Sequence, residues 1–189
     1  MTLSPIARTR LEKAASDNGF DIEREAVGTW LCFESSHAPL KLWLTEWSDA
    51  MLIAALSHPG VLRALSHGVA VAAPLPPGAV GGRGVTDFAE LHRLLRRALA
   101  LARALPNALW QTWVAETAEL PRTTEAERLV VQRVGQDLYR RGLLDLWDGR
   151  CAITGLAVPA LLRASHAKPW KDCERQQRLV CARGPPAAP

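Results

Sequence analysis

A histidine near the end of the sequence lies among cations that could hold an anion. The segment 162–170 reads LRASHAKPW and places His166 between Arg163 and Lys168, with Lys171 just beyond. An imidazole titrates near neutral pH and therefore suits a general base. Arginine and lysine side chains attract phosphate groups. These residue types favour attack of water on a phosphodiester, with His166 accepting the proton.

The same segment has two plainer interpretations. On the residues alone, His166 is better explained as a polar residue on a short strand that runs into a turn. A zinc site would need Cys151, His166 and Cys173, which are separated by residues 152–165 and 167–172. These gaps do not form the usual Cys-x-x-Cys pair, and a fourth ligand is not evident. We therefore do not expect zinc, and we expect Cys151 to be a packing residue.

The segment 124–173 resembles the front half of a bacterial HNH endonuclease domain. The similarity is carried by four motifs, which are QRVGQ at 132–136 within a helix, GRCAITG at 149–155, LLRASH at 161–166, and KPW with DC at 168–173. Each motif alone is weak evidence for the family, whereas the four motifs together are specific for it. The resemblance implies a metal-dependent hydrolase of DNA phosphodiester bonds, in which His166 is the first histidine of the motif and the general base.

The resemblance also implies a fold and a set of partners. The HNH fold is a two-stranded ribbon and a helix closed around one divalent ion, Mg²⁺ or Mn²⁺. Arg163, Lys168 and Lys171 would hold DNA phosphates. Ser165 stands where many such nucleases carry an acidic ligand, so the metal ligands are unknown and Asp172 is a weak candidate. Members of the family often act in restriction of, or defence against, foreign DNA.

The sequence after Cys173 departs from the HNH pattern. It reads ERQQRLVCARGPPAAP, with no histidine after His166 and no asparagine after Asn107, although the family places both in this half. We therefore expect an HNH unit that is truncated at its C-terminus. Codons for 184–188, shifted by one nucleotide, can encode Gly-Leu-Leu-Leu, so a frameshift after Cys173 is one hypothesis. Whether the chain is an enzyme stays open.

Two alternatives to an active nuclease follow from this departure. The chain could be a catalytically inactive HNH remnant that at most binds nucleic acid. It could also be an N-terminal interaction module with a vestigial tail. Measurable affinity for DNA through a basic groove would favour the first of these two alternatives over the second.

Basic charge gathers in the C-terminal part of the chain. From Pro121 onward there are 12 Lys and Arg and 7 Asp and Glu, whereas the first 120 residues carry 11 and 12. This favours an anionic partner, commonly nucleic acid, although a solvated surface explains the same pattern.

Apolar runs are shorter than the roughly 20 residues of a membrane helix. Residues 1–20 lack a signal-peptide core, and four scattered cysteines argue against a disulfide framework. We expect a cytoplasmic protein with no membrane partner.

The pattern along the chain predicts an α+β protein in two parts. Residues 1–118 should form a domain of helices and a small antiparallel sheet, with a role that target recognition would fit. Residues 119–189 should form the incomplete HNH unit, introduced by a long helix. We expect helices over 5–18, 87–105 and 124–147, a short helix after 57–60, strands over 20–24, 30–33, 40–44 and 69–73, and a loop over 74–84.

The first 120 residues carry histidines and tryptophans but no chemical motif. We interpret the histidines as surface or packing residues, and they are His37, His58, His67 and His92. The tryptophans could stack on bases, but core packing is the favoured interpretation. They are Trp30, Trp43, Trp47, Trp110 and Trp113.

Overall fold

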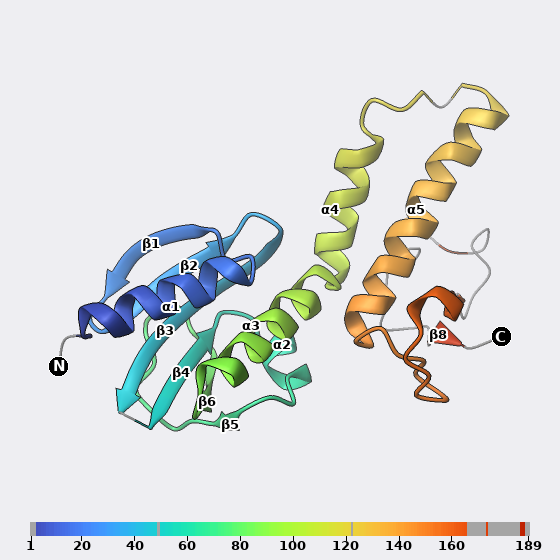
Figure 1. Ribbon diagram of the computed structural model, residues 1–189. Coiled ribbons are helices and arrows are strands. Elements are labelled where there is room, and N and C mark those ends of the chain that lie inside the picture. The colour runs from blue at the N-terminus through green and yellow to red at the C-terminus, as the bar shows by residue number, and fades with distance from the viewer. Residues whose placement is uncertain (1–2, 49, 122, 166–172, 174–185, 188–189) are drawn as a thin grey trace. The chain divides into compact units, whose positions relative to one another are not determined.

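The chain divides into two compact units, Met1–Ala102 and Arg103–Pro189 (Figure 1). The computed structural model describes residues 3–48, 50–121, 123–165, 173 and 186–187. Helices and antiparallel strands are both present, so the α+β class is confirmed. Residues 103–118, which the sequence analysis groups with the N-terminal part, belong to the second compact unit.

The first unit is built on a six-stranded antiparallel sheet with the order β1-β2-β3-β4-β6-β5. Its early strands match those predicted, and the Leu42 and Leu44 side chains of β3 are fully buried on one face. Strand β4 lies between β3 and β6 and was not predicted. The strands are β1 (Ile22–Val27), β2 (Trp30–Ser35), β3 (Ala38–Ser48), β4 (Met51–Leu56), β5 (Val69–Ala70) and β6 (Gly81–Val85).

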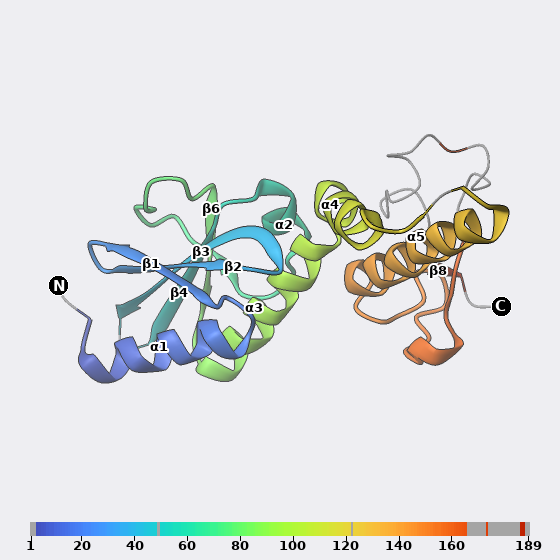
Figure 2. The same ribbon diagram turned by 90° about the horizontal axis from the view of Figure 1, so that it is seen from above.

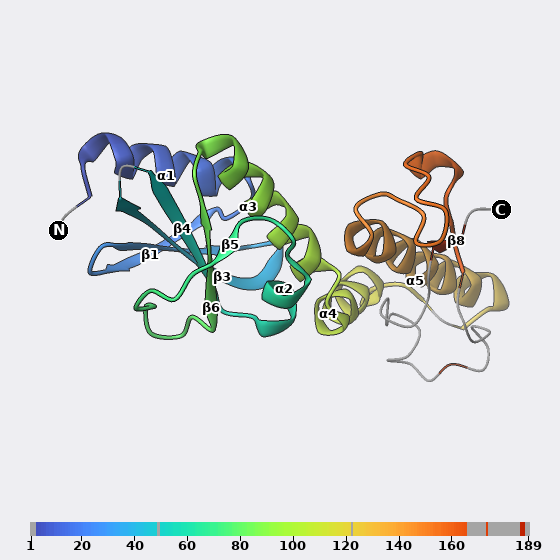
Figure 3. The same ribbon diagram turned by 90° about the horizontal axis from the view of Figure 1, so that it is seen from below.

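Two helices cover one face of this sheet (Figures 2 and 3). Helix α1 (Pro5–Asp17) begins where predicted, because the Ser4 hydroxyl accepts a hydrogen bond from the Ala7 amide at 3.1 Å. Helix α3 (Phe88–Arg103) presents a continuous apolar stripe. The stripe and the inward leucines of the sheet form a buried core, to which Leu11, Leu56, Leu91, Leu94 and Leu95 belong.

A loop covers the opposite face of the sheet. The buried side chains there are those of Trp30, Cys32, Trp43, Ile53 and Ala55. Apolar residues of the connection between β5 and β6 pack against them, which are Val71, Ala73, Leu75 and Ala79. Burial raises the pKa of the Cys32 thiol, so it stays protonated and acts as a packing group. Short helix α2 (Pro59–Ala64) precedes β5 and is capped by the His58 side chain.

The loop predicted over 74–84 is wrong at its end, because residues 81–85 form β6. This strand pairs with both β4 and β5. Its glycines leave room for neighbours: a Cβ built on Gly82 would lie 2.9 Å from Val71 Cγ2, and one on Gly84 would lie 2.9 Å from Val71 Cγ1. Glycine here allows close packing of the covering loop, whereas from sequence alone it resembles a turn signal.

The second unit is a helical hairpin with a short β-ribbon. Helix α4 (Pro106–Thr117), which the sequence analysis missed, packs on α5 (Glu125–Leu146) around Leu109, Leu138, Tyr139 and Leu143. After α5 come a 3₁₀ turn (Pro159–Leu161) and β7 (Arg163–Ala164), which pairs with β8 (Pro186–Ala187).

The apolar residues of α5 are buried only in its later turns. Val134 and Leu138 pack in the core of the second unit. In contrast, Leu129 and Val130, one or two turns earlier, are exposed. Packing against α4 is therefore confined to the later turns of the helix.

We predict that Gly82→Val destabilises the first unit by about 2 kcal/mol, because an overpacked β-branched side chain must displace Val71. Chemical denaturation followed by tryptophan fluorescence measures this loss. Ala70→Val on exposed β5 is the control and should change stability by less than about 0.5 kcal/mol. Equal stability of the Gly82 variant and the parent would contradict the packing account.

Candidate functional site

Helix α5 precedes the candidate site and begins with a closed capping box. The Thr124 hydroxyl accepts a hydrogen bond from the Glu127 amide at 3.2 Å, and the Glu127 carboxylate accepts one from the Thr124 amide at 2.9 Å. Hydrogen bonds from the Thr124 backbone and the Thr123 hydroxyl hold the pKa of Glu127 below its usual range. The predicted helix start is confirmed, and it is fixed by side chains.

The chain reverses direction after α5 around a buried thiol. Gly149 has a φ of 65°, and its amide donates to the Leu144 carbonyl at 2.8 Å, which ends the helix as predicted. Cys151 is only 3% exposed. Its amide donates to the Leu156 carbonyl at 2.8 Å, and its carbonyl accepts from the Gly155 amide at 2.9 Å. Cys151 is therefore a buried residue of a tight turn, consistent with the packing role predicted for it.

Two neighbouring side chains of α5 hold the segment that leads to the predicted base. Arg140 Nη2 donates to the Pro159 carbonyl at 2.7 Å and to the Leu162 carbonyl at 3.4 Å. The Tyr139 hydroxyl donates to the Ser165 carbonyl at 3.3 Å. Tyr139 and Leu162 are both buried. These two positioning residues were not predicted from the sequence, because nothing in a helical pattern marks which side chain reaches a distant carbonyl.

The structure describes one of the predicted site residues. Arg163 is exposed on β7. His166, Lys168, Lys171 and Asp172 lie outside the described residues. Their predicted roles as base, phosphate-binding cations and metal ligand therefore stay predictions.

Exposed guanidinium groups flank this segment. Arg150 and Arg163 are exposed, and neither forms an ion pair with another residue in the described ranges. Two other arginines of the unit, Arg103 and Arg141, are each paired with a carboxylate, at 3.0 and 3.3 Å. The positive charge beside the Cys151 turn is thus available to an anion, whereas that of Arg103 and Arg141 is compensated by a carboxylate.

The described residues do not fit a metal centre. Among them, no three His, Cys, Asp or Glu side chains gather as metal ligands would. Cys151 and Cys173 are both buried. The residues on which an HNH metal site would depend, Asp172 included, lie outside the described ranges. We therefore derive no metal-dependent step from the geometry.

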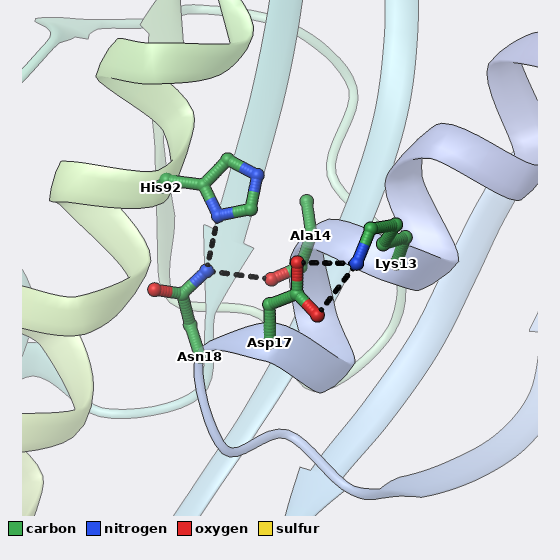
Figure 4. A network of polar contacts seen from close by, with 5 residues as sticks. All are labelled: Lys13, Ala14, Asp17, Asn18 and His92. Carbon is green, nitrogen blue, oxygen red and sulfur yellow. Dashed lines mark hydrogen bonds and ion pairs between the residues drawn. The ribbon is translucent and has the colours of Figure 1, made fainter.

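The histidines of the first unit have local structural roles where contacts define them. Asn18 Nδ2 lies 2.7 Å from the Ala14 carbonyl oxygen and 2.7 Å from His92 Nδ1 (Figure 4). An amide nitrogen only donates, so His92 Nδ1 accepts and the neutral ring carries its proton on Nε2. His92 thereby links the end of α1 to α3. His58 caps α2, and His37 is exposed.

Core packing is confirmed for two of the tryptophans that could have stacked on bases. Trp30 and Trp43 are buried under the loop that covers the sheet. Trp110 and Trp113 pack beside the core of the second unit, with ring centroids 5.0 Å apart. Trp47 is the exception, because half of its surface is exposed.

Comparison with known proteins leaves the family open. No family model, curated protein or solved structure matches the chain. In the described part of the chain, no helix combines the length and the apolar character needed to cross a bilayer. The case for a nuclease accordingly rests on the sequence motifs and on the structural context of the segment before His166.

We predict that Arg140→Met destabilises the second unit by about 1.5–3 kcal/mol, because two carbonyl groups lose a charged donor. Scanning calorimetry measures the loss. Arg141→Met is the matched control, because it removes an equal charge from an exposed pair and should cost less than about 1 kcal/mol. Equal losses in the two variants would show that Arg140 does not hold the segment.

Proposed function

We propose that the second unit is an HNH-type endonuclease module that hydrolyses DNA phosphodiester bonds. In this proposal His166 is the general base that accepts a proton from the attacking water, which then forms the new bond to phosphorus as the leaving oxygen departs. Arg163, Lys168 and Lys171 bind phosphates on either side of the reacting group. A divalent ion, Mg²⁺ or Mn²⁺, would stabilise the charge that develops on the phosphate. A cytoplasmic location is part of the proposal.

One observation carries the proposal. Ser165, which precedes His166 and follows the short strand β7, has its carbonyl hydrogen-bonded to the Tyr139 hydroxyl of α5. The same helix ends directly before the GRCAITG turn, which is closed by the buried Cys151. Motifs separated in the sequence are therefore joined in one local structure, with the exposed cations Arg150 and Arg163 near its ends. An anchored segment with uncompensated cations suits a polyanionic substrate.

A second candidate is binding of nucleic acid without cleavage. The observation that favours it is compositional: residues 167–189 contain no histidine and no asparagine, the two other residue types of the HNH motif. Asp172 is a weak candidate ligand in that segment. A chain with the basic surface and without a complete metal site would bind DNA and leave it intact.

We predict that the chain nicks supercoiled plasmid in Mg²⁺ or Mn²⁺, and that His166→Ala slows nicking by about 10²–10⁴-fold through loss of the general base. Gel separation of supercoiled and open-circular plasmid gives the rate. His37→Ala is the control, because His37 is an exposed histidine of the first unit, and it should leave the rate unchanged. EDTA should abolish nicking by every variant.

Other results would change the assignment. Plasmid binding without nicking would support the second candidate and reject hydrolysis. Nicking that survives His166→Ala would reject His166 as the base. Absence of both binding and nicking would contradict the proposal in either form.

A further inference from the structure

Helices α1 and α3 of the first unit are held side by side by contacts along their length. Near the start of α3, the Arg10 guanidinium carbon lies 3.8 Å from the centroid of the Phe88 ring. Further along, Asn18 bridges to His92 (Figure 4). These contacts, with α1 and α3 on the same face of the sheet (Figure 2), fix the outer surfaces of the two helices as one platform. We call this platform the α1/α3 face.

The α1/α3 face exposes cations that the rest of the unit does not neutralise. Arg93 and Arg96 are exposed on α3, three residues apart, which places them on adjacent turns about 4.5 Å apart along the axis. Neither has a carboxylate partner within the described ranges. Arg10 and Lys13 are exposed on α1. Lys13 is paired with Asp17 at 2.9 Å, so one acidic group of this surface is already occupied.

Other arginines of the unit are paired with carboxylates. Arg8 is paired with Glu12, and Arg24 is paired with Glu34 at 2.7 Å. Glu34 also binds Lys41 at 2.7 Å, and these cations hold its pKa below the usual range. The unit therefore places a carboxylate beside Arg8 on α1 and beside Arg24 on β1. Within the described ranges, Arg93 and Arg96 have no such partner, and the same is true of Arg10 and of Arg63 on α2. Three of these unpaired arginines, Arg10, Arg93 and Arg96, belong to the two helices of the α1/α3 face.

We propose that the α1/α3 face binds the phosphate backbone of DNA, with Arg93 and Arg96 as the principal contacts and Arg10 beside them. The inference rests on the proposed function, because it gives the nuclease module a second hold on the same substrate. Arginine suits this role, since its planar guanidinium donates two parallel hydrogen bonds to a phosphate. Arg10 stacks on Phe88 through its face and keeps its edge donors for an anion.

An anionic membrane is a less suitable partner for this surface. A helix that lies on a bilayer inserts large apolar side chains between the headgroups. In the described part of α3 no large hydrophobic residue is exposed, and on α1 the exposed one is Ile6, at its first turn. The face therefore offers charge without an inserting group, which matches a nucleic-acid backbone.

The test is binding of the full chain to a short fluorescein-labelled DNA duplex, measured by anisotropy in EDTA so that no cleavage intervenes. Arg93→Gln with Arg96→Gln should weaken binding at least about tenfold and lower the slope of log K against log salt by about 2, because each phosphate contact contributes about 0.9. Arg93→Lys with Arg96→Lys, which keeps the charge, should retain most of the affinity. Circular dichroism confirms that each variant is folded.

The matched control removes two charges from the opposite face of the same sheet. Arg24→Gln with Lys41→Gln changes the net charge equally and takes away both partners of Glu34. If both double variants lose affinity equally, the effect is one of net charge and the α1/α3 face is rejected. If the Arg93/Arg96 variant binds DNA like the parent, this inference alone fails.

Two further outcomes distinguish failure of the proposed function from failure of this inference alone. If the parent chain does not bind the duplex at all, the proposed function fails together with this inference. If the Arg93/Arg96 variant loses binding to phosphatidylserine vesicles while its DNA affinity is unchanged, the face is a membrane surface and the inference is overturned.

Discussion

The second unit depends on the hydrogen bonds that the Tyr139 and Arg140 side chains donate to backbone carbonyls of the segment 159–165. That segment is short, and β7 within it spans only Arg163–Ala164. A strand of this length has little stability of its own, since isolated ribbons are marginal in water. Hydrogen bonds from α5 to the carbonyls of Pro159, Leu162 and Ser165 add to the pairing of β7 with β8. The helix therefore does more than cover a core, because its side chains set the path of the backbone into His166.

In the first unit both faces of the sheet are apolar, and both must be covered. Two helices cover one face, and a single loop with Val71 and Leu75 covers the other. A loop packs tightly only where the strand beneath it leaves space, and Gly82 and Gly84 of β6 provide that space. The result is a sheet with both faces covered. The helical layer on one face presents its exposed charges in a defined arrangement.

Sequence patterns predicted those elements whose ends are set by local chemistry. Ser4 with Pro5, Thr124 with Glu127, and Gly149 each mark a helix boundary through a hydrogen bond or a backbone angle that neighbouring residues determine. The failures were non-local. Strand β6 is defined by its pairing with β4 and β5, and its glycines leave room for Val71. Helix α4 was not predicted, and it begins at Pro106, directly after the helix predicted over 87–105. The motifs point to the segment that leads to His166, whose role stays a prediction. They do not reveal that Tyr139 and Arg140 hydrogen-bond to carbonyls 26 and 19 residues away.

The most direct test of the central claim observes His166 itself on DNA. The chain has 5 histidines, so histidine-selective carbon labelling gives a simple NMR spectrum, and His166→Gln identifies the signal of that ring. A duplex is then titrated into the labelled protein in EDTA. Our account predicts that the His166 signal shifts with the DNA concentration, whereas that of exposed His37 stays in place. A His166 signal that is unchanged under saturating DNA would contradict the assignment of this residue to the nucleic-acid site.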